Sequence, residues 1–115
     1  MILYGIKNCN TVKSAVDWLN KRKIKFEFFD YKSKPITEAK LKEWSGQIGW
    51  EPLINKRGTT WRQFSPALQA KITNEAAATK LMKENNSVIK RPVIEHQGKV
   101  VTVGFDETEY KKIFG

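Results

Sequence analysis

The chain has 115 residues and a net charge of +9, which comes from 21 lysines and arginines against 12 acidic residues. This length predicts one domain, and the single cysteine and single histidine exclude an intramolecular disulfide and a tetrahedral zinc site of nitrogen and sulfur ligands. The charge favours anionic partners, but the basic residues are scattered along the chain rather than gathered beside aromatic residues, so a dedicated nucleic-acid surface is disfavoured.

The first third of the chain predicts a strand, a helix and a second strand. Residues 1–5 are mostly apolar, and residues 11–23 carry apolar side chains at helical spacing. Residues 24–31 then alternate apolar and polar side chains, which is typical of a strand. Because a helix separates the two strands, we expect them to be parallel in a βαβ unit.

The middle of the chain predicts helices, and its end predicts a hairpin and one more helix. A helix follows Thr37 and ends at Gly49, and after a loop over residues 50–64 two short helices are expected. The two short helices are predicted over residues 66–71 and 75–84. Two strands of a hairpin follow over residues 92–95 and 99–103, and the final helix begins at Asp106.

No segment predicts export or membrane insertion. The first residues run directly into a strand pattern, without a basic segment followed by an apolar one, and no apolar stretch approaches the length of a membrane span. We therefore expect a cytoplasmic protein with no membrane partner.

Cys9 lies between the first strand and the first helix, where unpaired backbone N–H groups favour an anion. A free cysteine has a pKa of about 8.5, and a helix N-terminus with a basic neighbour such as Lys7 can lower it to roughly 3.5 to 7.5. The alternative is a buried cysteine that only fills space. The polar flanks Asn8, Asn10 and Thr11 favour the reactive interpretation, because they can shape the turn, cap the helix or donate to a thiolate.

Four segments of the chain carry a family resemblance: residues 3–9 (Leu-Tyr-Gly-Ile-Lys-Asn-Cys), 56–62 (Lys-Arg-Gly-Thr-Thr-Trp-Arg), 90–92 (Lys-Arg-Pro) and 103–105 (Val-Gly-Phe). From end to end the chain resembles the ArsC-like arsenate reductase family, in particular its YffB/Spx-like branch. The resemblance implies an α/β, thioredoxin-like fold, in which a four-stranded mixed sheet has flanking helices. It also implies a single domain over residues 1–115, with an inserted helical subdomain at about 33–86.

The resemblance further implies roles for individual residues. Cys9 matches the family's nucleophile, and Arg91 matches the arginine that points at the thiolate or its bound oxyanion. Pro92 matches the proline whose cis bond faces the active cysteine. Arg57 and Arg62 are candidates for a basic pocket beside the thiol, or they form a solvated charge cluster in a loop.

Three positions depart from the family pattern. Glutathione-dependent arsenate reductases place three arginines around the oxyanion, but Asn55 and Val103 occupy two of the matching positions here, which argues against arsenate reduction. Regulators of the family often carry two cysteines three residues apart. The second of these positions is Val12 in this chain, so a dithiol switch is excluded.

The sequence therefore predicts a monothiol reductase with Cys9 as the thiolate nucleophile and Arg91 as its partner. Its substrate would be an oxidised thiol or an oxyanion, and glutathione or another small thiol would resolve the adduct, since the chain has no second cysteine. No bound cofactor or metal is expected. The alternative is an Spx-like regulator or interaction module that binds an acidic protein such as RNA polymerase. The predicted substrate-binding residues are Lys7, Asn8, Asn10, Thr11, Arg57, Arg62 and Pro92.

Overall fold

The computed structural model describes residues 1–115 as two compact units. Residues 1–34 and 91–115 form the sheet unit, and residues 35–90 form the helical unit. The elements in chain order are β1 (Ile2–Gly5), α1 (Asn10–Lys21), β2 (Glu27–Asp30), α2 (Glu38–Ile48), α3 (Thr59–Gln63), α4 (Pro66–Lys71), α5 (Glu75–Glu84), β3 (Val93–His96), β4 (Lys99–Val103) and α6 (Glu107–Phe114), with 3-10 helices at Glu51–Leu53 and Asn86–Val88.

The four strands form one mixed sheet in the order β2-β1-β3-β4. β1 is parallel to β2 and antiparallel to β3, and β3 pairs with β4 as an antiparallel hairpin. In this register Gly5 faces Asp30 and Tyr4 faces Val93. The carboxyl ends of β1 and β2 therefore lie at the same edge of the sheet as the amino end of β3. The predicted mixed α/β architecture is confirmed.

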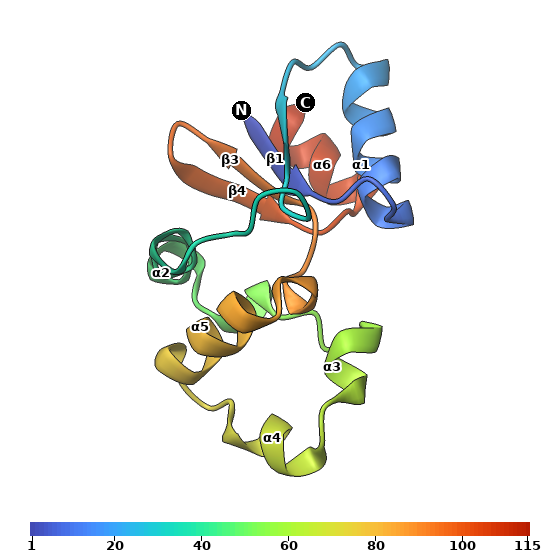
Figure 1. The fold of residues 1–115 in the computed structure, drawn as a ribbon. Helices are drawn as coiled ribbons and strands as arrows, with labels where there is room; N and C mark the ends of the chain where they lie inside the picture. The colour runs from blue at the N-terminus through green and yellow to red at the C-terminus, as the bar shows by residue number, and fades with distance from the viewer. The chain divides into compact units, whose positions relative to one another are not determined.

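Helices α1 and α6 cover one face of the sheet (Figure 1). Leu3 of β1 and Ile94 of β3 point into the core on that face. The ring of Trp18 from α1 meets Tyr110 from α6 edge to face, with 5.4 Å between ring centroids. This aromatic contact anchors the two helices against each other, because such pairs add to the effect of area burial.

The helical unit has a core of its own, in which α2 packs against α5. Thr37 caps α2 and Asn74 caps α5, each by accepting a hydrogen bond from a backbone N–H three residues on. Backbone hydrogen bonds join the C-terminal end of the unit to its middle, including Lys90 N–H to the Leu53 carbonyl at 2.7 Å and Asn55 N–H to the Val88 carbonyl at 2.9 Å. The fully buried side chains of this core include Leu41, Trp44, Leu53, Met82 and Ile89.

The structure corrects several predicted boundaries. Residues 59–63 form helix α3 inside the segment predicted as a loop, because a helix of little more than one turn carries no apolar periodicity. β2 is shorter than the predicted strand over residues 24–31. Helix α1 begins at Asn10, which places Cys9 at the N-cap in the extended conformation and Thr11 inside the first turn. None of the helices has the length and apolar character needed to cross a membrane.

Candidate active site around Cys9

Three side chains from separate segments meet at the sheet edge where β1 and β2 end. Cys9 lies in the loop between β1 and α1, Arg91 lies two residues before the start of β3, and Tyr31 lies directly after β2. Arg91 forms side-chain hydrogen bonds with both Cys9 and Tyr31. The site is therefore assembled by the sheet topology from residues up to 82 positions apart in the chain.

The N-terminus of α1 faces the sulfur of Cys9. The Cys9 carbonyl accepts the first helical hydrogen bond, from Lys13 N–H at 2.9 Å, and the N–H groups of Thr11 and Val12 stabilise the charged form of the sulfur. The thiol makes no regular side-chain capping hydrogen bond, so the interaction depends on charge. A thiolate gains from these unpaired donors, whereas a neutral thiol gains little.

The pKa of Cys9 is lower than the ordinary value for a thiol. Partial burial is the largest effect and by itself raises this pKa, because it disfavours the charged form. The Val12 N–H, the hydrogen bond and charge of Arg91, and the Thr11 N–H together outweigh the burial. A partly exposed thiol that ionises more readily than usual has the properties of a nucleophile.

Tyr31 is the member of the site that sequence reasoning did not identify. Its side chain is only 4% exposed, and its N–H donates to the Gly5 carbonyl at 3.1 Å. Burial raises the pKa of the Tyr31 phenol, although the neighbouring Arg91 guanidinium lowers it in part. The available signal was its position as the last residue of the predicted parallel strand over residues 24–31, at the edge where Cys9 also had to lie.

The Arg91-Pro92 peptide bond is cis, as the resemblance implied. Pro92 is buried, and its carbonyl accepts a hydrogen bond from Gly104 N–H at 2.8 Å. Gly104 has a φ of +81°, which is a left-handed conformation that glycine adopts without strain. The backbone beside Arg91 is thus tied to the turn that follows β4.

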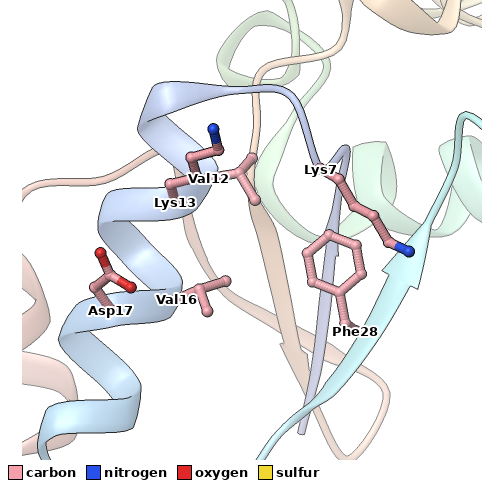
Figure 2. Close-up of a pocket in the computed structure, with 6 residues that line it drawn as sticks. All are labelled: Lys7, Val12, Lys13, Val16, Asp17 and Phe28. Carbon is pink, nitrogen blue, oxygen red and sulfur yellow. The ribbon is translucent and has the colours of Figure 1, made fainter.

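A cavity of about 310 Å³ lies beside the first turns of α1. Figure 2 shows Val12 and Val16 pointing from α1 toward Phe28 of β2, with the Lys7 side chain extending past the Phe28 ring. Val12 links this cavity to the thiol, because its N–H acts on the sulfur while its side chain lines the cavity. The lining residues are Lys7, Val12, Lys13, Val16, Asp17 and Phe28.

The other residues predicted for the site occupy different surroundings. Lys7 lines the cavity and is not among the groups that shift the pKa of Cys9, so its predicted effect on the thiol is not supported. Asn8 and Asn10 are exposed on either side of Cys9. Arg57 and Arg62 are exposed in the helical unit, and their predicted role at the thiol stays a prediction.

Asn55 has a local structural role at the position where the resemblance implies an arginine. Its side-chain oxygen accepts from Arg57 N–H at 3.1 Å, which closes a turn. Its carbonyl accepts from Gly58 N–H at 3.2 Å, and a Cβ added to Gly58 would lie 2.8 Å from the Asn55 amide nitrogen. The second departing position, Val103, is part of β4 and pairs with Val93.

Known proteins are similar to this chain over almost its whole length. A model of the ArsC family matches residues 4–113. An uncharacterized protein of Haemophilus influenzae is 38% identical over 112 residues, which covers 97% of this chain and 96% of that protein. The global transcriptional regulator Spx of Lactiplantibacillus plantarum is a more distant relative, 24% identical over 114 residues, with 97% of this chain and 84% of that protein covered.

Solved structures agree with this placement over almost the whole chain. A structure of the YFFB protein has 39% sequence identity and a TM-score of 0.89, covering 99% of this chain and 98% of its own. An arsenate reductase (ArsC) related protein from Brucella melitensis has 37% identity and a TM-score of 0.81, covering 98% of this chain and 92% of its own.

Proposed function

The chain belongs to the ArsC family, and from this membership and the site around Cys9 we propose that the protein is a monothiol reductase that uses glutathione. The observation that carries the proposal is the placement of the partly exposed Cys9 thiol at the N-terminus of α1 and beside the Arg91 guanidinium, which lower its pKa. A structural cysteine would not need a guanidinium and a helix N-terminus directed at its sulfur.

The proposed reaction has two thiol exchange steps, and the electrons balance in each. The Cys9 thiolate attacks the glutathione sulfur of a mixed disulfide, so that a Cys9 to glutathione disulfide forms and the other thiol leaves as a thiolate. A second glutathione thiolate then attacks this adduct. Cys9 is released as a thiolate and oxidised glutathione leaves, so the net reaction consumes one free glutathione, and the other half of the oxidised glutathione comes from the mixed disulfide.

Arg91 and the N-terminus of α1 have a role in both steps. They stabilise negative charge on the Cys9 sulfur, which is the attacking atom in the first step and the leaving atom in the second. The single cysteine of the chain requires an external thiol for the second step. This requirement supports a small, abundant thiol such as glutathione as the co-substrate.

An oxidised thiol is a better proposed substrate than an oxyanion such as arsenate. Stabilising the charge of a multivalent oxyanion requires several cationic donors, and Arg91 is the one guanidinium that the sheet unit places at Cys9. The cavity is lined by the apolar side chains of Val12, Val16 and Phe28, together with two lysines and the carboxylate of Asp17. It suits an organic group with a carboxylate, as glutathione or a peptide thiol would carry.

The second candidate function is a regulator that binds an acidic protein, as proposed from the relation to Spx and the net charge of +9. A binding surface of this kind does not require an ionised thiol. The two functions therefore differ in what they expect of a Cys9→Ser variant: the reductase loses all turnover, whereas the binding module keeps its affinity for the partner.

The deciding experiment is the pH dependence of Cys9 alkylation by iodoacetamide in the reduced protein, followed with and without glutathione disulfide. We expect a midpoint below that of the unfolded chain, since Arg91 and the N-terminus of α1 lower the pKa of Cys9 from its ordinary value. We also expect glutathione disulfide to convert Cys9 to a single glutathionyl adduct that mass spectrometry detects and that added glutathione removes.

The matched control for reactivity is the unfolded protein in denaturant, in which Cys9 has lost Arg91 and the helix. Its alkylation midpoint should lie near about 8.5. A folded-state midpoint at or above that of the unfolded chain would reject the reductase. A low midpoint with no glutathionyl adduct would keep a reactive thiol but reject glutathione as the co-substrate.

A further inference from the structure

Tyr31 is held firmly at the edge of the sheet. It follows the last residue of β2, its N–H donates to the Gly5 carbonyl at the end of β1 at 3.1 Å, and its side chain is 4% exposed. Gly5 in turn begins the loop that contains Cys9. Backbone contacts therefore place the Tyr31 side chain next to the loop of the nucleophile.

The hydrogen bond between Tyr31 and Arg91 has only one chemically allowed direction. A guanidinium has N–H donors and no acceptor, so the phenolic oxygen of Tyr31 must accept from Arg91. The same guanidinium also interacts with the Cys9 sulfur. Arg91 therefore bridges a phenol oxygen on one side and a sulfur on the other.

We propose that Tyr31 is a positioning residue for the nucleophile: by accepting one N–H of Arg91, it holds the guanidinium in the orientation in which it faces the Cys9 sulfur. The arginine side chain is long and flexible, and fixing it in one geometry costs conformational entropy. A buried acceptor at a defined place offsets this cost. The proposal concerns the activation of the thiol, and it holds for any electrophile that Cys9 attacks.

A tyrosine suits this role better than a carboxylate. A buried aspartate or glutamate would orient Arg91 equally well, but its negative charge would cancel the positive charge that the thiolate uses. The Tyr31 phenol is neutral at physiological pH, since the ordinary pKa of tyrosine is about 10 and burial raises it further. Tyr31 can thus orient the guanidinium of Arg91, and the full positive charge of the guanidinium remains available to Cys9.

The test is the alkylation midpoint of Cys9 in a Tyr31→Phe variant, which removes the acceptor and keeps the ring. We expect the midpoint to rise by about half to one pH unit, which lowers the ratio of thiolate to thiol about threefold to tenfold at a fixed pH. In an Arg91→Ala background the same substitution should have no further effect, because Tyr31 acts through Arg91. Tyr31→Met, which also lacks the oxygen, makes the same test if the phenylalanine variant does not fold.

Tyr110→Phe is the matched control within the same unit. Its hydroxyl donates to the Gly104 carbonyl at 2.8 Å and is buried, so this variant also loses one buried hydrogen bond. It should unfold at a lower temperature and keep the wild-type alkylation midpoint. If Tyr31→Phe folds and keeps the wild-type midpoint while Arg91→Ala raises it, the positioning role is wrong and the activated thiol remains. If Arg91→Ala also keeps the midpoint, the activation of Cys9 that the proposed function requires is wrong as well.

Discussion

Arg91 supplies the fixed charge at the candidate active site. Its guanidinium hydrogen-bonds to Cys9 and Tyr31, and both contacts raise its own pKa against the opposing effect of burial. It therefore stays charged at any physiological pH. Lys7 is closer to Cys9 in the sequence, but its side chain extends past Phe28 along the cavity (Figure 2). Proximity in sequence was a poor guide to which cation acts on the sulfur.

Replacing Arg91 should therefore affect the thiol more than replacing Lys7. We expect Arg91→Ala to raise the pKa of Cys9 by about one unit, since it removes both a charge-assisted hydrogen bond and a charge. Lys7→Ala is the matched control and should leave the pKa unchanged. The alkylation midpoint measures both. An equal rise in the two variants would mean that a diffuse positive field, and not the Arg91 contact, ionises the thiol.

At the scale of elements, the close approach of α1 to β1 places the helix N-terminus at the thiol. Gly5 ends β1, and a Cβ built on it would lie 3.0 and 3.1 Å from the two methyl groups of Val12. Val12 is 1% exposed, so its methyl groups are enclosed by the protein next to the strand. The absence of a side chain at Gly5 allows the first turn of α1 to pack against the strand, and that turn carries the N–H groups that act on Cys9.

A Gly5→Ala substitution should move Val12 by a few tenths of an ångström and disturb this turn. We expect a loss of about 1 to 3 kcal/mol in the free energy of unfolding, as for other overpacked sites, and a higher pKa of Cys9. Urea unfolding and alkylation measure the two effects. Gly46→Ala in α2 is the control, because its Cβ would meet nothing within 4 Å and alanine favours a helix. Wild-type stability in Gly5→Ala would contradict the packing argument.

At the scale of the whole molecule, the ionised thiol links folding to pH. Because the pKa of Cys9 is lower in the folded protein than in the unfolded chain, the unfolded chain binds more protons between the two values. The free energy of unfolding should therefore rise with pH over that window and level off above about 8.5. Below the folded pKa this contribution is lost.

The measurement is a series of chemical unfolding curves of the reduced protein between about pH 5 and 9. Cys9→Ser provides the reference, since the difference in stability between wild type and variant isolates the thiol. As the pH rises, the free energy of unfolding of the wild type should increase relative to that of Cys9→Ser. A difference that is constant with pH would show that Cys9 titrates alike in both states, and that the fold does not stabilise its thiolate.

Most of the chain's elements were predictable because their signals are local. The apolar periodicity of α1 and the Asp106 cap of α6, which accepts from Glu109 N–H at 3.0 Å, are visible within a few residues of sequence. The five-residue helix α3 was missed because so short a segment shows no period. The position of Cys9 between β1 and α1 was also a local feature, so the nucleophile was identified before its surroundings were known.

Residue order alone is enough to show that this protein has one thiol, that this thiol lies between a strand and a helix, and that any resolving thiol must come from another molecule. The groups that surround the thiol follow from the folding of the sheet. Tyr31 and Arg91 are sixty residues apart, and no local pattern relates them. They meet because β1 pairs with β2 on one side and with β3 on the other, and strand pairing is a long-range choice made by the whole sheet as it buries its core.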